Sequence, residues 1–149
     1  MLQQRLSHGM SAALEQARSS LEEGGVPIGA ALSDSAGHIV ASGHNQRIQR
    51  DSQILHAEID CLANAGRRHD YSRTVLYSTL MPCYMCAGAI VQFGIPKVVV
   101  GESRNFGGAQ DLLESHGVVV ENLNNDECAH LLGAFIESSP EIWFEDIGK

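Results

Sequence analysis

The sequence has no long hydrophobic run, and no segment approaches the roughly 20 consecutive apolar residues that a membrane-spanning helix needs. Its first residues, with Gln3, Gln4 and Arg5 ahead of a broken apolar pattern, also lack the apolar core of a secretory signal peptide. Cysteine is scarce, with four in 149 residues, which agrees with a reducing compartment. We therefore expect no membrane association and a cytoplasmic location.

Basic residues are also few. Lys and Arg number 10 against 18 Asp and Glu, which gives a formal net charge of −8. A protein that binds a polyanion needs a basic face, because phosphate neutralisation supplies most of the sequence-independent affinity for nucleic acid. Arg47 with Arg50 and Arg67 with Arg68 are the local basic groups, and we interpret them as solvated loop charges. The charge balance favours a small neutral substrate and argues against a nucleic-acid partner.

The sequence does contain enough apolar material for one folded domain. Hydrophobic residues make up 44% of the chain and charged residues 19%, which is typical of a folded rather than a disordered protein. No linker, internal repeat or low-complexity tract interrupts the sequence. We predict a single domain over residues 1–149.

Apolar spacing alternates between helical and strand periods. Apolar residues three and four apart predict an amphipathic helix over residues 2–21, ended by Gly24 and Gly25. A hairpin with strands over 26–32 and 38–41 follows. The later predicted elements are helices over 55–65, 83–93, 109–115 and 126–139 (the last capped by Asp126), strands over 74–79, 97–101 and 118–120 (the last two buried), and a terminal segment over 140–146. This order predicts a three-layer α/β/α sandwich around a mixed five-stranded sheet.

Two short motifs carry the chemistry: H-x-E at His56 and Glu58, and P-C-x-x-C at Cys83 and Cys86. One histidine and two cysteines can bind zinc through three protein ligands, which leaves the fourth tetrahedral position open for water, as in catalytic sites. Glu58 stands close to the metal without having to bind it and can move protons. The two motifs together are the pattern of zinc deaminases, in which zinc-activated water attacks the amidine carbon of a base.

The motif spacing also makes a geometric prediction. Residues two apart on a helix do not share a face, so His56 and Glu58 address one site only if His56 stands at or before the first turn. Cys83 and Cys86 are three apart, so both sulfurs fall on one face of the first turn of their helix. The site would then be built from two helix beginnings, whose positive dipole ends favour thiolates and other negative charge.

A C-x-x-C motif alone is ambiguous, because it also occurs in redox pairs and structural zinc sites. A closed structural site needs a fourth protein ligand, for which Cys61 and Cys128 are the candidates. Both lie in apolar or amphipathic segments, and we interpret them as buried small hydrophobic residues. Outside the enzymes, the alternative is a zinc-stabilised binding protein without turnover.

Other positions leave two interpretations open. Asn45 is either an ordinary loop amide, which the pattern favours, or a hydrogen-bonding group aimed at a ligand. Trp143 and Phe144 belong either to a terminal helix docked on the core, which the pattern favours, or to a lid over the pocket. The other histidines have no partner at ligand spacing, and we interpret them as surface or turn residues: His8, His38, His44, His69, His116 and His130.

The sequence resembles the fungal-type cytosine deaminases, a branch of the cytidine deaminase-like superfamily, over nearly the whole chain. The zinc motifs belong to the whole superfamily, whereas the Trp-Phe-Glu-Asp-Ile-Gly tail looks particular to the branch that deaminates free bases. The residues that carry the resemblance are 23–29, 43–45, 56–59, 79–83, 85–86, 93–96, 100–102 and 143–148.

This resemblance implies a Zn²⁺ cofactor on His56, Cys83 and Cys86, with Glu58 shuttling protons during hydrolytic deamination of a free nucleobase. Cytosine, converted to uracil and ammonia, is the first candidate substrate. The resemblance also implies a homodimer and a place in pyrimidine salvage. For the substrate, it implies that Asn45 holds the pyrimidine carbonyl and that the other contacts come from Asp146 at the ring edge, Ile28, Phe106 and Trp143 in the pocket wall, and the backbone of Ala57 and Met81.

Two positions depart from the family pattern, which has glycine at Ala57 and a small polar residue at Met81. Both are understood to offer mainly backbone groups to the base, so their roles can persist while the pocket volume changes. His-Ala-Glu and Pro-Cys-x-Met-Cys-Ala-Gly-Ala are equally similar to bacterial tRNA adenosine deaminases. Alternative substrates are therefore a base in RNA, against which the acidic balance and the tail weigh, and another amino-heterocycle such as guanine.

Overall fold

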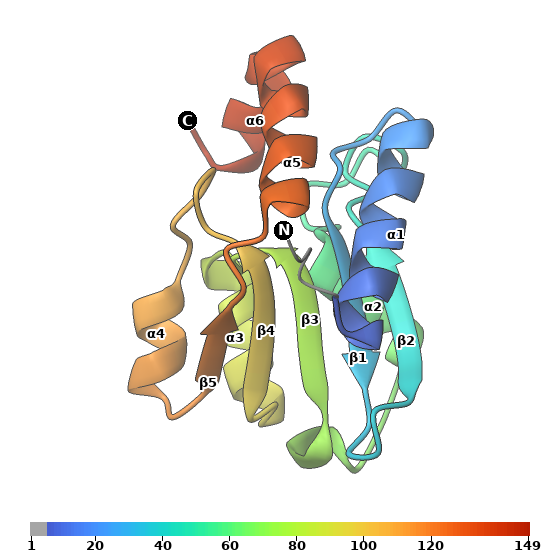
Figure 1. The fold of residues 1–149 in the computed structure, drawn as a ribbon, viewed down its shortest axis with the longest axis vertical. Coiled ribbons are helices and arrows are strands. Elements are labelled where there is room, and N and C mark those ends of the chain that lie inside the picture. Colours follow the sequence, from blue (N-terminus) through green and yellow to red (C-terminus); the bar gives the residue numbers. More distant parts are fainter. Residues whose placement is uncertain (1–5) are drawn as a thin grey trace, which may run out of the picture.

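The computed structural model describes residues 6–149, and its elements follow the predicted order (Figure 1). The strands are β1 (Gly29–Ser33), β2 (Ile39–His44), β3 (Val75–Leu80), β4 (Lys97–Glu102) and β5 (Val119–Asn122). The helices are α1 (His8–Glu22), α2 (Ala57–Ala65), α3 (Tyr84–Phe93), α4 (Gln110–Ser115), α5 (Asp126–Ser138) and α6 (Pro140–Asp146), with a 3-10 turn at Tyr71–Arg73.

The strands form one mixed sheet in the order β2-β1-β3-β4-β5, which confirms the five-stranded prediction. β1 runs antiparallel to β2 and β3, whereas β3, β4 and β5 are parallel. The start of β1 and the ends of β2, β3 and β4 therefore meet at one edge of the sheet, which is formed by the ends of strands and not by an outer strand. This edge receives Ile28, Asn45, Met81 and the loop after Glu102, four segments that are far apart in sequence.

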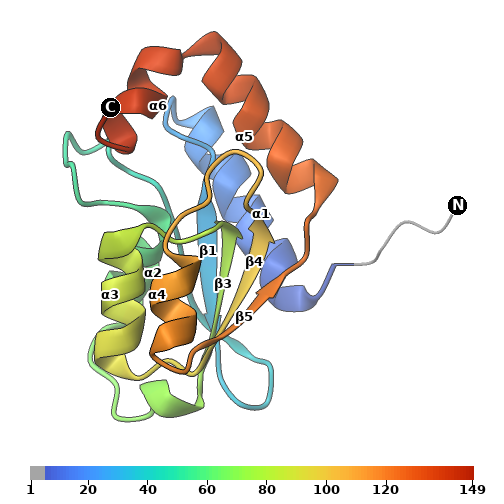
Figure 2. The same cartoon turned by 90° about the vertical axis from the view of Figure 1, so that its left-hand side faces the viewer.

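Helices cover both faces of the sheet, which confirms the three-layer prediction (Figure 2). Strand alternation explains how one sheet serves two cores. Ala30, Leu32 and Val98 belong to the larger core with α2, α3 and α4, while Ala31 and Val99 belong to the smaller core with α1 and α5. The short helix α6 follows α5 and packs near the edge of the sheet described above (Figure 2).

Helix α1 lies directly on β1, without a side chain between them, at Gly29. A Cβ atom built there would lie 1.9 Å from the carbonyl oxygen of Ala13 and 2.5 Å from the backbone nitrogen of Ala17. Both neighbours are backbone atoms, so no rotamer change can make room. Glycine is required here by close approach, which fixes α1 against the sheet.

Two expectations about the elements need correction. β5 is not buried, because it forms an edge of the sheet and Val119 is 58% exposed. Asn125, not Asp126, caps α5, since its side chain accepts a hydrogen bond from the backbone N–H of Cys128 at 2.9 Å. The first helix begins at His8 after its Ser7 cap, and the predicted start at residue 2 lies outside the described residues. Within residues 6–149, no helix combines the length and apolar character needed to cross a bilayer.

Candidate active site

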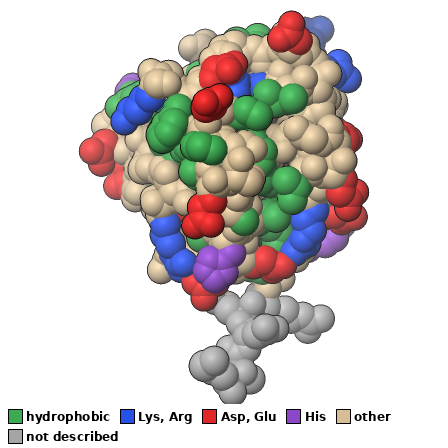
Figure 3. All heavy atoms as spheres, turned by 90° about the horizontal axis from the view of Figure 1, so that it is seen from above, with side chains coloured by type: hydrophobic (Ala, Val, Ile, Leu, Met, Phe, Trp, Pro, Cys, Tyr) green, Lys and Arg blue, Asp and Glu red, His purple; other side chains and the backbone are tan. Residues whose placement is uncertain are grey.

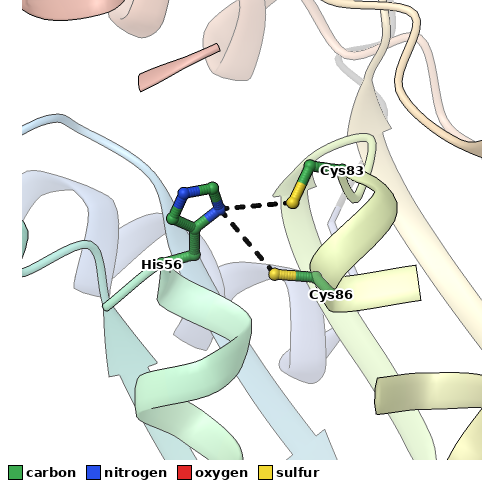
Figure 4. A group of neighbouring side chains, drawn as sticks. All are labelled: His56, Cys83 and Cys86. Carbon is green, nitrogen blue, oxygen red and sulfur yellow. Dashed lines mark hydrogen bonds between the residues drawn. The ribbon is translucent and has the colours of Figure 1, made fainter. Parts of the chain in front are cut away.

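The metal-ligand candidates meet where two helices begin (Figure 4). His56 and Cys83 are the N-cap residues of α2 and α3, and Cys86 lies in the first turn of α3. The Nδ1 atom of His56 is 3.4 Å from the sulfur of Cys83 and 3.8 Å from that of Cys86. A tetrahedral zinc ion with ordinary bond lengths separates such nitrogen and sulfur atoms by about 3.5 Å. The three groups therefore fit zinc, and the predicted placement of His56 before the first turn is confirmed.

The cluster has three members. Among residues 6–149, the His, Cys, Asp and Glu side chains that converge in this way are His56, Cys83 and Cys86, with ligand atoms within 4.8 Å of one another. Cys61 and Cys128 are buried at 0% and 2% exposure and lie outside the cluster, as predicted. Three protein ligands leave room for one exchangeable position on a tetrahedral ion, which is the arrangement of catalytic zinc sites.

The second ring nitrogen of His56 faces Asp146. Nε2 lies 2.9 Å from Oδ1 of this carboxylate, which comes from the end of α6 and is 3% exposed. A carboxylate beside one ring nitrogen fixes the histidine tautomer and leaves the other nitrogen free for a metal. Burial by itself lowers the pKa of His56, but Asp146 and Cys83 outweigh it and raise the pKa to about 10. Asp146 thus orients the histidine, a relationship that the motif spacing did not reveal.

Glu58 lies beside the ligand cluster in the first turn of α2, and it is 4% exposed. Burial raises the pKa of this carboxyl from 4.5 to about 7, against a smaller opposing effect of His56. The hydrogen bond with Cys86 lowers the pKa of Cys83 to about 4, with His56 adding to the effect. A carboxyl group that titrates near neutrality can both accept and return a proton, and a low thiol pKa makes the thiolate that zinc binds.

These groups border a cavity of about 490 Å³ at the edge of the sheet where the four segments meet. All of the predicted substrate-binding residues and Glu58 line this cavity. Of the three predicted metal ligands, His56 and Cys83 line it and Cys86 does not. The lining comprises Ile28, Asn45, Gln53, Ile54, His56, Ala57, Glu58, Leu80, Met81, Cys83, Tyr84, Met85, Phe106, Trp143, Asp146, Ile147, Gly148 and Lys149. The structure therefore brings segments from five parts of the chain to one place.

Asn45 lies on the cavity wall and is only 1% exposed. Its side-chain oxygen accepts a hydrogen bond from the backbone N–H of Arg47 at 3.1 Å, and its Nδ2 donates to Oδ2 of Asp146 at 3.4 Å. This residue is therefore not an ordinary exposed loop amide, the interpretation that the sequence pattern favoured. Its amide and the carboxylate of Asp146 form one polar edge of the cavity.

Trp143 serves both the core and the cavity. It is 4% exposed, belongs to the larger core and packs edge-on against Phe106, with ring centroids 6.1 Å apart at 88°. Its place in the core agrees with the docked-helix interpretation, and it also lines the cavity, as a lid residue would; the lid itself stays a prediction. Phe144 differs, since it is 46% exposed.

The two positions that depart from the family pattern are both buried. Ala57 is the first helical residue of α2, so its backbone N–H belongs to the turn that has no partner within the helix. Met81 is 1% exposed, and its side chain lies under the loop at Gly108, where a Cβ atom would come within 2.6 Å of Met81 Cγ. Gly108 also has φ +62°, so glycine is needed there on both counts.

Two residues were misjudged from sequence. Arg47, interpreted as a solvated loop charge, is 3% exposed and pairs with Glu145 and Asp146 of α6. His44, interpreted as a surface or turn residue, has a side chain 13% exposed between Gln16 and Glu23. The carboxylate partners of Arg47 and the two partners of His44 lie 21 to 99 positions away in sequence, so local composition could not reveal them.

Gln53 and Ile147 also line the cavity and were missed. Neither belongs to a zinc motif, and a residue's place on a wall made of several segments has no local signature. By contrast, four of the histidines are exposed as expected: His8, His69, His116 and His130. His38 also behaves as predicted, since it follows the hairpin turn and is largely exposed.

The fold and the ligand set define a class: an α/β/α zinc deaminase whose metal-ligand residues lie at two helix N-termini. Residues 3–102 match the family model described as the cytidine and deoxycytidylate deaminase zinc-binding region. This match covers more than half of the chain, and the chain belongs to that family of zinc-dependent hydrolytic deaminases.

Curated relatives span nearly the whole length. The chain is 47% identical over 143 residues to a cytosine deaminase of Candida albicans, covering 95% of both chains. It is 35% identical over 144 residues to a tRNA-specific adenosine deaminase of Streptococcus pyogenes, covering 89% of this chain and 90% of the relative.

Solved structures share the fold. A guanine deaminase from Nitrosomonas europaea superposes with a TM-score of 0.76 at 24% identity, covering 91% of this chain and 86% of that one. At this level of identity the likeness concerns the arrangement of helices and strands. It agrees with the three-layer architecture derived above.

Proposed function

We propose that this protein deaminates a free nucleobase and that cytosine, converted to uracil and ammonia, is its substrate. The observation that carries the proposal is the part that α6 takes in the cavity wall: Trp143 and Asp146 line the cavity, and Asp146 contacts His56 of the metal-ligand cluster. A base held there is enclosed on its polar and apolar edges by one chain. The 47% identity to a cytosine deaminase supports the same substrate.

His56, Cys83 and Cys86 would hold the zinc ion, which supplies a water of lowered pKa that can attack C4 at neutral pH. Glu58 takes the proton that this water releases and passes it to ring N3, which makes C4 electrophilic. Glu58 next takes the hydroxyl proton of the oxygen added at C4 and delivers it to the exocyclic amine; the C4–N bond then breaks, the C4 carbonyl forms and ammonia leaves. Water and cytosine are thereby converted to uracil and ammonia, with Glu58 returned to its starting state.

Substrate orientation falls to the polar edge of the cavity. The amide of Asn45 binds the pyrimidine carbonyl, and Asp146 reaches the ring edge while holding His56. The apolar walls are Ile28, Phe106 and Trp143, and the first-turn amide of Ala57 offers a backbone donor. A site that hydrogen-bonds a substrate group discriminates strongly against analogues without it, because its own polar atoms are then left unpaired.

The second candidate is deamination of adenosine in tRNA, which the 35% identity to a tRNA-specific enzyme supports. The surface argues against it. Lys and Arg side chains on the end of the molecule that carries α5 and α6 lie in separate places among acidic ones (Figure 3). Binding an RNA stem through its phosphates favours a continuous basic surface.

A substrate panel separates these candidates. The zinc-loaded protein is incubated with cytosine, 5-methylcytosine, isocytosine, guanine, creatinine, free adenosine and a tRNA anticodon stem-loop, and ammonia release is measured. We expect turnover of cytosine. Activity on the stem-loop alone would overturn the free-base proposal, and silence on every compound would support a zinc-stabilised binding protein.

We further propose that residues 1–149 act as one deaminase domain, that the protein forms a homodimer, and that it works in the cytoplasm in pyrimidine salvage. An apolar groove on the outer side of α2 and α3 supports the dimer, and Phe93 on it is 50% exposed. Light scattering of the purified protein tests the dimer. Growth of a pyrimidine auxotroph on cytosine tests the role in salvage.

A further inference from the structure

The most unusual charge in the molecule is the guanidinium of Arg47. Its side chain is only 2% exposed, although it stands in a connection between β2 and α2. A buried cation is costly unless charged and polar partners surround it. The two charged partners of Arg47, Glu145 and Asp146, both come from the end of α6, nearly a hundred residues later in the sequence.

The guanidinium of Arg47 contacts three side chains at once. Nη2 donates to Oε1 of Gln53 at 2.7 Å and to Oε1 of Glu145 at 3.1 Å, while Nε lies 3.4 Å from Oδ1 of Asp146. Gln53 closes the arrangement, because its Nε2 donates to the backbone carbonyl of Glu145 at 3.2 Å. Arg47 and Gln53 of the β2–α2 connection therefore bind Glu145 and Asp146, two consecutive residues of α6.

These contacts lie behind the polar edge of the cavity. The backbone N–H of Arg47 donates to Asn45, whose side chain also donates to Asp146. Arg47 itself does not line the cavity, so it would not touch a bound base. Its effect on a substrate would pass through the segment that it holds, which carries Trp143 and Asp146.

We propose that Arg47 is a positioning residue that anchors α6 over the cavity and so sets the fraction of molecules in the closed, binding-competent state. The proposal rests on the function proposed above, because closure matters only if a small substrate binds beneath α6. A seven-residue helix has little stability of its own and depends on contacts with the rest of the protein. Arg47 supplies the charged contact at its C-terminal end.

Trp143 offers a built-in probe of this closure, since it is the only tryptophan in the sequence and is 4% exposed. We compare zinc-loaded wild type with Arg47→Gln, using acrylamide quenching of tryptophan fluorescence without substrate. Steady-state kinetics on cytosine are measured in parallel. Arg50→Gln is the matched control, because Arg50 is an exposed residue of the same connection whose Nε bonds only to Gln46 among residues 6–149.

We expect Arg47→Gln to raise the quenching constant by about twofold or more, because an unanchored α6 opens more often. Apparent affinity falls in proportion to the competent fraction, so KM should rise about tenfold while kcat stays within about threefold. Arg47→Lys keeps the charge but lacks the planar guanidinium with its several N–H donors. Its quenching constant and its KM should lie between those of wild type and Arg47→Gln. Arg50→Gln should match wild type in both measurements.

Quenching of Arg47→Gln equal to that of wild type would overturn the proposal, whatever substrate the protein uses. A lower unfolding midpoint with unchanged KM and unchanged quenching would also overturn it, since that result describes a purely structural residue. If Arg47→Gln does not fold, Glu145→Gln replaces it, because the Glu145 side chain is 64% exposed and its loss cannot disrupt the core. Quenching that rises in Glu145→Gln supports the anchor, and quenching that does not rise contradicts it. If the wild-type protein does not deaminate cytosine but quenching still increases in Arg47→Gln, the proposed substrate is wrong and the anchoring role of Arg47 is retained.

Discussion

The zinc corner and the C-terminal closure of the same cavity are built in opposite ways. The zinc corner, His56 to Glu58 with Cys83 to Cys86, depends on two short motifs, each at a helix beginning. The closure depends on pairs such as Asn45 with Asp146 and Arg47 with Glu145, which are 101 and 98 residues apart. Chemistry is thus encoded locally, while enclosure of the substrate is encoded at long range. Changes in the corner should remove turnover, and changes in the closure should mainly alter binding.

The largest effect is expected from Glu58→Gln, which keeps the size of the side chain but cannot transfer protons. Turnover should fall by about four orders of magnitude, because a positioned general acid–base contributes up to that much. Ammonia release and zinc stoichiometry are measured together, with the exposed Glu114→Gln as the control. Zinc should remain bound. Normal turnover in Glu58→Gln would remove the proton-transfer role from the corner.

The same substitution should stabilise the metal-free protein at high pH. Burial raises the pKa of Glu58 from 4.5 to about 7, so the native state binds its proton more tightly than the unfolded state does. This contribution to stability is complete below pH 4.5 and is lost as the pH rises through 7. The free energy of unfolding of the wild type, relative to that of Glu58→Gln, should therefore fall by up to about 3 kcal/mol between pH 4.5 and pH 8. Urea denaturation of both metal-free proteins at the two pH values measures the difference, and an equal gap at both would contradict the assignment.

Asp146→Asn tests the point where the corner and the closure touch. Loss of the carboxylate beside Nε2 of His56 should weaken zinc binding by about 10- to 100-fold, because the tautomer of the histidine is no longer fixed. Chelator competition measures the affinity, and the exposed Asp111→Asn provides the control. Unchanged zinc affinity together with a raised KM would place Asp146 in the closure alone.

The smallest effect is expected from Ala57→Gly, which introduces the glycine that the resemblance described above implies for this position. Glycine inside a helix costs about 1 kcal/mol relative to alanine, and Ala57 is the first residue of α2, so the free energy of unfolding should fall by no more than that amount. The kcat/KM for cytosine should change by no more than about threefold, because the backbone N–H is retained. A larger change would mean that the Ala57 methyl group shapes the pocket.

The contrast between the two regions also explains what the sequence could predict. Helix spacing placed His56 before the first turn of α2 and both cysteine sulfurs together, because these relationships depend only on helical geometry. The layers and the sheet followed from alternating periods. Exposed β5 was misjudged because an apolar run of three residues looks the same at the centre and at the edge of a sheet.

Arg47 and His44 show the limit most clearly. A charged residue in a polar loop has no local feature that distinguishes a solvated side chain from a buried one. What decides is whether carboxylates from another element reach it, and for Arg47 they come from α6. The contact of Asp146 with His56 escaped prediction for the same reason, since 90 residues separate the two.

The contact of α1 with β1 at Gly29 has a practical meaning for anyone who diversifies this gene. In a saturation library screened only for abundance in cells, every codon but glycine should disappear at this position, because any larger side chain meets backbone atoms. The zinc-corner positions should survive that screen better and be lost only when growth requires the enzyme. A pair of selections run side by side would thus sort scaffold from chemistry without a single purified sample.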